Sequence, residues 1–430
     1  MGRKAVSRLF YNLSIGLTLV LAIVTLGAAG ATFIAPAASV ALTFVGLALP
    51  VLLLCNLVAA LYWTIRWRCW LWIPLIAIAG NWWYLSCIWQ PGSSAAKPNG
   101  RTVMIDQAAG KRAAIGSAID GADGAAEVQA AGERAADGYS NSVLTVITYN
   151  VASFNKETSG HTCKQIASFL KSEQADIVCF QECGINSTFT ADSVRAAMSE
   201  FPYSLIPYTP DSIPLLQLAV FSKYPIRASR LITYPNSKNC SMWCDISIHG
   251  KTIRLFNNHL QTTAVKSNKR HLDKAIGKIL RRVMGKIVEE EMNELQQLPD
   301  LHKNVEIAAS SLLKELHQNF IKRSLQADIV KKQIDASPYP LLVCGDFNSI
   351  PSSYSYHIIK GTKGKKGTKS AKLSDGFQSC GHGYMYSYRY LKRLLIIDYI
   401  LHSAEIEGVD YYSPELTYSD HKPVVMRVRM

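Results

Sequence analysis

Three long apolar runs open the chain, and polar positions become frequent only after them. The runs are Leu13–Ile34, Val40–Tyr62 and Trp70–Trp89, and each has roughly the 20 residues that a membrane-spanning helix needs. The pattern therefore predicts three transmembrane helices, about 13–34, 40–62 and 70–89, in a membrane domain of residues 1–90. A cleaved signal peptide does not explain the pattern, because the first run is too long for one and two more follow.

Basic residues mark one side of these runs. Three of them precede the first run, two more, Arg66 and Arg68, separate the second run from the third, and the loop between the first two runs has no charge. Basic residues flank the cytoplasmic ends of membrane helices. We expect a multi-pass protein of the cell membrane whose chain after Trp89 is extracytoplasmic, in the periplasm. If the third run only lay along the membrane surface, that part would be cytoplasmic.

The pattern changes twice after the third run. Residues 91–141 are rich in Ala and Gly with scattered charges, which is typical of a linker. From residue 142 to residue 430, short apolar runs alternate with stretches of helical spacing, which predicts a globular α/β domain. The strands are expected at Val143–Tyr149, Ala175–Gln181, Leu218–Ser222, Met242–Ile248, Thr252–Leu260, Leu341–Cys344, Leu395–His402 and Pro423–Val428.

One long insertion interrupts this alternation. Lys266–Asp335 is charged and has no glycine after Gly285, so we expect two or more helices with a break at Leu298–Pro299. Such a segment could serve as a lid or as helical packing, and packing is the favoured interpretation.

Charge and cysteine content narrow the function classes. The formal net charge is +14, of which residues 142–430 carry +10, and a basic domain suits an anionic substrate or surface. The loop Lys360–Lys372 contains six lysines with no aromatic residue between them, so it could contact phosphates but would not stack on bases. A solvated loop explains it equally well.

The ten cysteines show no repeated CxxC pattern, which argues against a structural zinc site. In an extracytoplasmic domain Cys240 and Cys244 could form a disulfide, provided that a turn lies between them.

Polar residues gather where one apolar run ends. Leu341–Cys344 reads as a buried strand, and Gly345, Asp346 and Asn348 follow directly. A carboxylate there can bind a metal or accept a proton, and a carboxamide can orient a water or a phosphate oxygen. An ordinary Asx turn would use the same residues.

The same arrangement recurs at other predicted strand ends, and this repetition is what an ordinary turn does not explain. Polar groups next to or within the last residues of buried strands are typical of the sites of α/β enzymes. The candidate site residues are Asn150, Glu182, His259, Asp346, Asn348, Asp398, Asp420 and His421.

At these residues the sequence resembles the endonuclease/exonuclease/phosphatase superfamily, and the likeness is closest to its membrane-anchored bacterial members. The matching pieces cover residues 142–430 in the family's order: TYNV (148–151), QE (181–182), NHL (258–260), GDFN (345–348), IDYI (397–400) and SDH (419–421). The resemblance implies a four-layer DNase I-like α/β sandwich, in which two packed β-sheets are flanked by helices. It also implies metal-assisted hydrolysis of phosphate esters at one rim.

The resemblance further implies a metal site. Glu182 would be the main ligand of Mg²⁺ or Mn²⁺, Asp420 would complete the metal cluster, and Asn150 would support the metal or a phosphate oxygen. A hard divalent cation held by carboxylates suits phosphate chemistry.

The remaining residues would act on water and phosphate. Asp346 would align or deprotonate the attacking water, and Asn348 would fix the phosphate. His421, oriented by Asp398, would contact the scissile phosphate, and His259 would be a second phosphate-binding or leaving-group histidine. This inventory meets the needs of phosphodiester hydrolysis, which are charge neutralisation, an aligned water and a proton for the leaving oxygen.

One departure from the family pattern concerns an arginine. Members often have Arg just before the Ile-Asp-Tyr stretch, where this chain has Ile396, so a phosphate contact from Arg389 or Arg393 is the expected replacement.

The substrate class stays open at this point. A nuclease or phosphodiesterase, a phosphomonoesterase, and a phospholipid- or sphingomyelin-type phosphodiesterase would all use such a site, so the substrate could be a nucleic acid, a lipid head group or a small ester. A membrane-tethered scaffold that has lost catalysis is the alternative of another class. Besides the membrane, no obligate protein partner is evident.

Overall fold

The computed structural model describes residues 3–92, 143–155, 159–185, 189–207, 216–263, 298–361, 370–390 and 393–430. The predicted linker, apart from its first two residues, lies outside this part of the chain. So do residues 266–297 of the predicted helical insertion and most of the lysine-rich loop.

The N-terminal part is helical and apolar. It consists of α1 (Arg3–Gly30), η1 (Ala31–Phe33), α2 (Val40–Leu47), α3 (Leu49–Ile65), η2 (Cys69–Leu71), α4 (Trp72–Gly80), α5 (Trp82–Ile88) and the short strand β1 (Trp89–Gln90). Within the described residues, one helix spanning Val6–Phe33 is long and apolar enough to cross a membrane, or up to three cross if each bent helix pair is one span.

The two bent pairs correspond to the second and third predicted runs. The axes of α2 and α3 meet at 58°, and those of the η2–α4 helix and α5 meet at 61°. Pro50 stands in the first turn of α3, where a proline is tolerated but ends the preceding helix. At the second bend the Asn81 side chain donates hydrogen bonds to the carbonyls of Ala77 and Thr25, 3.0 and 3.2 Å away. The three transmembrane helices therefore remain a prediction.

Polarity in this helical part is inverted relative to a soluble protein. Asn56 is buried and donates to the Thr25 hydroxyl over 2.7 Å, and buried Trp63 donates to the Thr18 hydroxyl over 3.0 Å. Large apolar side chains instead point outward: Leu9, Phe10, Leu13, Leu17, Val20, Ile23, Val51, Leu54, Leu57, Val58 and Leu61. Polar groups paired inside and an apolar exterior suit a lipid environment.

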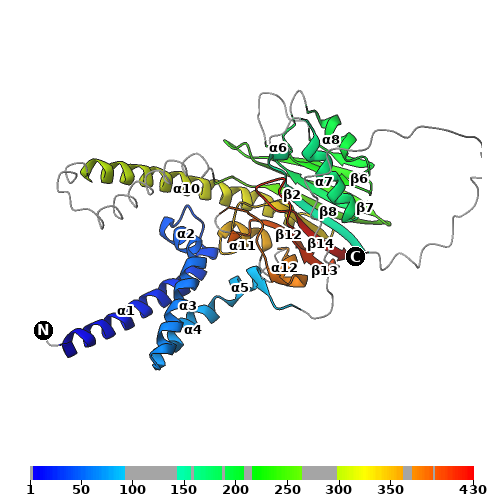
Figure 1. Ribbon diagram of the computed structural model, residues 1–430. Coiled ribbons are helices and arrows are strands. Elements are labelled where there is room, and N and C mark those ends of the chain that lie inside the picture. Colours follow the sequence, from blue (N-terminus) through cyan, green and yellow to red (C-terminus); the bar gives the residue numbers. More distant parts are fainter. Residues whose placement is uncertain are drawn as a thin grey trace, which may run out of the picture.

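Two six-stranded mixed sheets form the framework of the α/β domain that follows the N-terminal helices (Figure 1). The first has the order β13-β14-β2-β3-β5-β4 and the second β10-β12-β9-β8-β7-β6. The strands are β2 (Val143–Asn150), β3 (Ile177–Gln181), β4 (Tyr203–Leu205), β5 (Ala219–Ser222), β6 (Ile226–Thr233), β7 (Cys240–Ile248), β8 (Lys251–His259), β9 (Leu341–Asp346), β10 (Ser374–Asp375), β12 (Asp398–His402), β13 (Glu407–Tyr412) and β14 (Val424–Arg429).

Strand alternation builds two hydrophobic cores. Val146 and its neighbours on one face of β2 and β3 join β7, β8 and β9 in a core between the sheets. Ile147, on the other face, packs in a second core under α7 (His161–Ser172) and α8 (Ala191–Ala197). Residues of α10 (Leu298–Asp335) and α11 (Tyr354–Lys360) cover the second sheet. The result is the predicted arrangement of two packed sheets with helices outside, which fits the DNase I-like fold.

The N-terminal helices contact the α/β domain directly. Strand β1 pairs with β11 (Gly383–Tyr384), and the Ser352 hydroxyl donates to the Gly46 carbonyl over 2.9 Å. The ring centroids of Phe44 and Phe320 lie 5.9 Å apart, which places α2 against α10. In Figure 1 the N-terminus lies at the far end of α1 from the sheets.

Cys240 and Cys244 lie on the same extended strand, β7, and their thiols are free. The turn that a disulfide would need is absent from this strand, so the two cysteines do not meet the condition for a bridge.

Candidate active site

Strand ends of both sheets meet at one rim, and the predicted residues lie there. In the first sheet β2 and β3 run parallel, and Asn150 is paired with Gln181 just before Glu182. In the second sheet β8 and β9 run parallel, and His259 is paired with Asp346. Because the carboxyl ends of parallel strands share one edge, residues distant in sequence become neighbours.

Asp346 is at the centre of this cluster. Its Oδ2 accepts a hydrogen bond from Nδ2 of Asn150 at 3.0 Å, and its Oδ1 accepts one from the backbone N–H of Asn348 at 2.8 Å. Burial, reinforced by the charge of Asp398, raises the pKa of Asp346, and nearby His421 partly offsets this. The carboxylate is thus held in one orientation by groups from two sheets.

His421 and Asp398 form a buried pair. Nδ1 of His421 lies 2.9 Å from Oδ2 of Asp398, and the Ser387 hydroxyl accepts a hydrogen bond from the Asp398 backbone N–H. Burial alone would lower the pKa of His421, but the charges of Asp398 and Asp346 outweigh it and raise this pKa to about 10. The imidazole is therefore cationic at neutral pH, and its Nε2 lies 3.7 Å from Oδ2 of Asp346.

His259 differs from His421 in its surroundings. It is fully buried, and its Nε2 lies 3.6 Å from Oε1 of Glu182 and 3.7 Å from Oδ2 of Asp346. Burial lowers its pKa to about 4, so this imidazole is neutral. Within the part of the chain that the structure describes, neither ring nitrogen of His259 has a hydrogen-bond partner.

The loop that carries Asp420 and His421 is docked onto the rim by a neighbouring serine. The Ser419 hydroxyl donates to the carbonyl of Asn150 over 2.7 Å and accepts the backbone N–H of His421 over 3.1 Å. Ser419 is the first residue of the SDH motif, and no role was predicted for it from the sequence. Its two hydrogen bonds show that it positions Asp420 and His421.

A cavity of about 850 Å³ opens at this rim. Glu182, Asp346, Asn348, Asp420 and His421 line it, so five of the eight predicted residues reach its surface. The other three, Asn150, His259 and Asp398, lie behind them in contact with Asp346, Glu182 or His421. The structure therefore brings all eight residues together, five at the cavity surface and three behind them.

The donor set fits a hard divalent cation. Glu182 and Asp420 both offer carboxylate oxygens at the cavity surface. Nε2 of buried His259 lies 3.6 Å from Oε1 of Glu182 and has no hydrogen-bond partner among the described residues. Asn150 reaches the same place through its amide nitrogen, 3.4 Å from Oε1 of Glu182. Ligand atoms of Asp346, Asp398 and His421 also lie within 4.8 Å of one another, and in this group Nδ1 of His421 is already bonded to Oδ2 of Asp398.

Two cavity-lining residues were missed by sequence reasoning. Arg323, on α10, is 2% exposed and lines the cavity, whereas the expected arginines do not: Arg389 binds Glu415, and Arg393 lies over the ring of Tyr386. No motif surrounds Arg323, and only the packing of α10 brings it to the site.

Tyr388 is the second missed residue. Its ring packs edge-on against His421 with centroids 5.1 Å apart. The aromatic run YSYRY at residues 386–390 was the available signal.

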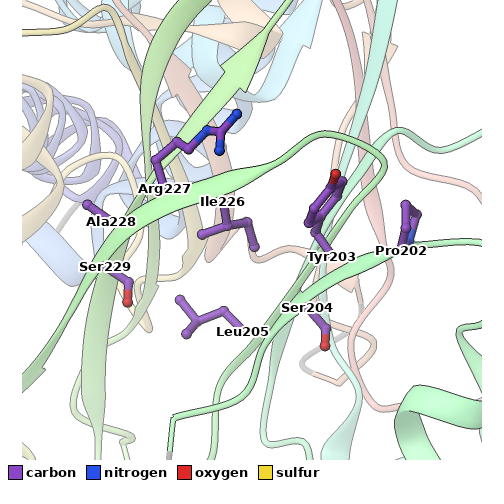
Figure 2. Close-up of a pocket in the computed structure, with 8 residues that line it drawn as sticks. All are labelled: Pro202, Tyr203, Ser204, Leu205, Ile226, Arg227, Ala228 and Ser229. Atoms are coloured by element: carbon purple, nitrogen blue, oxygen red, sulfur yellow. The ribbon is translucent and has the colours of Figure 1, made fainter.

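A second cavity, of about 480 Å³, lies between the edge strands β4 and β6 (Figure 2). Its lining contains no predicted site residue and one charged side chain, Arg227. It therefore contributes nothing to the chemistry at the rim.

Comparison with protein families divides the chain into the same two parts. The Endonuclease/Exonuclease/phosphatase family matches residues 147–421, a segment that contains all eight predicted site residues. A Domain of unknown function (DUF8431) matches residues 8–88. No curated protein matches the chain.

Several solved structures are similar at low identity. An endonuclease/exonuclease/phosphatase from Bacteroides vulgatus is 15% identical, with 67% of this chain and 99% of that chain covered and a TM-score of 0.43. TDP2 of D. rerio, complexed with single strand DNA product, is 14% identical, with 67% and 100% covered and a TM-score of 0.42. The human Nocturnin catalytic domain with bound sulfate anion is 14% identical, with 67% and 96% covered and a TM-score of 0.41.

Proposed function

Because the chain belongs to the endonuclease/exonuclease/phosphatase family, whose members are hydrolases acting on phosphoester bonds, we propose that it is a membrane-anchored, metal-dependent phosphodiesterase. The observation that carries the proposal is the rim itself, where five of the eight predicted site residues line one cavity and the other three contact them from behind. A catalytically inactive scaffold would have no need of this supporting shell.

Glu182 and Asp420 are the proposed ligands of Mg²⁺ or Mn²⁺, and Asn150 supports the metal by holding the Glu182 carboxylate. When bound, such a cation neutralises charge on the phosphate and polarises the phosphorus–oxygen bond. His259, fully buried between Glu182 and Asp346, is a positioning residue for these carboxylates in this proposal, since it does not line the cavity.

Asp346 is the proposed water-aligning group. Its two oxygens are fixed by Asn150 and by the Asn348 backbone, so an incoming water meets a carboxylate of set orientation. Asn348 binds the phosphate, and its side chain is steadied by donating to the Leu260 carbonyl over 3.1 Å.

His421 is the proposed acid. Asp398 binds its Nδ1, which leaves Nε2 directed toward the cavity side, where it can donate to a phosphate oxygen or protonate the leaving oxygen. The carboxylate orients the ring and stabilises its cationic form.

The membrane anchor is the remaining part of the proposal. The helix through Val6–Phe33 is long and apolar enough to span a bilayer, and we propose a multi-pass anchor with the catalytic domain outside the cytoplasm. Two contacts support this: the Trp70 indole donates to the Tyr11 hydroxyl, and the Arg68 guanidinium lies over the Tyr11 ring. They bring the basic ends of the helices together, at the end of α1 that is remote from the sheets.

The test is hydrolysis of bis(4-nitrophenyl) phosphate by the full chain in detergent, with Mg²⁺ and with excess chelator. We expect turnover that the chelator abolishes and that Asp398→Asn reduces while leaving the fold intact. His161→Ala, at an exposed position on α7, is the matched control. Inactivity toward diesters, monoesters, DNA and lipid alike would refute the proposal and favour the scaffold.

A further inference from the structure

Apolar residues as well as catalytic residues line the cavity at the rim, and the apolar part of the lining is its apolar half. Beyond Asp346 and His421 it is lined by Leu316 and Phe320 of α10 and by residues of the N-terminal helices. The latter are Ala31, Ile34, Pro36, Thr43 and Leu47. A volume of about 850 Å³ lies in the range of sites that enclose a small-molecule ligand.

Part of this wall comes from outside the family domain. Residues 31–47 precede the family-matched segment, residues 147–421. They run from the end of the helix Val6–Phe33, which is able to span a membrane, through α2, the first half of a bent pair that could form a second span. Specific contacts hold them in place: Nε2 of His317 lies 3.1 Å from the Pro36 carbonyl oxygen, and the Phe33 ring packs edge-on against His357 with centroids 4.6 Å apart. The wall is therefore a built feature of this chain and shapes which substrates enter.

The apolar half is continuous with the surface of the membrane helices. Leu47 lines the cavity and is 39% exposed, and Phe33 and Val40 on the same segment are 68% and 45% exposed. Apolar side chains that face outward on this segment therefore lie close in sequence to those that line the cavity. Apolar exposed patches of this kind mark binding or membrane surfaces.

Arg323 stands among the residues that line this cavity. Its Nε donates to the Gln261 carbonyl over 2.8 Å and its Nη2 to the Thr263 hydroxyl over 2.6 Å. In the described part of the chain these bonds use two of its five N–H donors. A guanidinium held in this way, 2% exposed, complements a phosphate or an anionic head group.

We infer, on the basis of the proposed phosphodiesterase function, that the substrate is a membrane-lipid phosphodiester. Its phosphate lies at Asp346 and His421, and its apolar chain lies along α10 and residues 31–47. In the reaction the water oxygen bonds to phosphorus, the bond from phosphorus to one ester oxygen breaks, and that oxygen takes up a proton. The products are an alcohol and a phosphate monoester.

The test uses phosphodiesters that share one leaving group and differ only in the other ester. The full chain in detergent is given 4-nitrophenyl phosphates that carry a methyl, butyl, hexyl or octyl group, and the 4-nitrophenyl ester of thymidine 5′-phosphate. We expect kcat/KM to rise by about fourfold for each methylene that the wall covers, mainly through KM. The octyl ester should exceed the thymidine ester, and labelled phospholipid in phosphatidylcholine vesicles should be cleaved.

Two variants fill the apolar half, and one control leaves it open. In Leu47→Trp and in Thr43→Phe, the ratio of kcat/KM for the octyl ester to kcat/KM for the methyl ester should fall by at least about tenfold. Leu54→Trp, at a position that is 60% exposed on α3 and does not line the cavity, should keep the dependence of the unmodified protein.

The outcomes separate the two proposals. Equal kcat/KM values for methyl and octyl esters, or a preference for the thymidine ester, would overturn the lipid inference while the proposed phosphodiesterase stands. Inactivity toward every one of these diesters would overturn the phosphodiesterase, and the lipid inference with it.

Discussion

Gly345 is the residue whose substitution the structure predicts most sharply. It has φ +132° and lies on β9 opposite Asn258 of β8. A Cβ atom added there would lie 2.0 Å from the Asn258 carbonyl oxygen and 2.6 Å from its backbone nitrogen. Both atoms belong to the backbone of a central strand, so no side-chain rotation relieves the collision.

The cost of Gly345→Ala has two parts. A positive φ costs an L residue roughly 1–2 kcal/mol, and forcing an extra carbon into a packed interior costs typically 1–3 kcal/mol. The substitution should therefore destabilise the β8–β9 pair by about 2–5 kcal/mol. Because His259 and Asp346 are the next pair in this register, turnover should fall as well.

Gly250→Ala is the matched control. This glycine also has a positive φ, +80°, but among the described residues no atom other than those of its chain neighbours lies within 4 Å of the added Cβ. It should show only the backbone part of the cost, roughly 1–2 kcal/mol.

Hydrogen exchange of the β8 and β9 amides, measured on the full chain in detergent, reports the difference. A loss of about 2 kcal/mol in opening free energy corresponds to about 30-fold faster exchange. The β8 and β9 amides of Gly345→Ala should therefore exchange about 30-fold faster than those of Gly250→Ala. Equal exchange in the two variants would show that the collision with Asn258 is not what requires glycine. Native turnover in Gly345→Ala would refute the link to the site.

The remaining predictions concern the site and the anchor. His421→Ala should lower turnover about 10²–10⁴-fold with little effect on folding, because a positioned acid–base group is lost; kinetics and circular dichroism check this, and native activity in the folded variant would remove the mechanism. Glu182→Gln should raise the Mg²⁺ concentration needed for half-maximal activity, since a carboxamide is a poorer ligand for a hard cation, whereas exposed Glu200→Gln should not. A phosphatase reporter fused after residue 141 should be active, and signal only from a cytoplasm-specific reporter would contradict the outward topology.

The sequence alone determined the fold class and most of the candidate site. Buried strands have short apolar runs, so local pattern assigned Asn150, Glu182, His259 and Asp346 to strand ends. The family resemblance implied that these ends share one rim, and the parallel pairs β2–β3 and β8–β9 bring them together. Both sheets and the family assignment confirm the two-sheet α/β fold. The boundaries moved by a few residues, as for β12, which begins at Asp398, because strand ends depend on partners that a local pattern does not contain.

What only the tertiary structure decided is which groups share the cavity and at what depth. His259 lies at a strand end like the others, yet it is fully buried, with its Nε2 3.6 Å from Oε1 of Glu182, and no local pattern sets this depth. Arg323 has no motif around it, and it reaches the cavity only through the packing of α10.

The apolar lining that residues 31–47 contribute to the cavity could not be predicted from the sequence either. Residues 31–47 comprise the end of the first apolar run, the loop after it and the start of the second run. The two runs predict only membrane insertion, and their apolar side chains would suit a lipid-facing helix or a cavity lining. Long-range contacts place this segment at the cavity: His317 contacts Pro36, 281 positions away, and Ser352 contacts Gly46, 306 positions away. Local pattern sets which elements form, and long-range packing sets what they enclose.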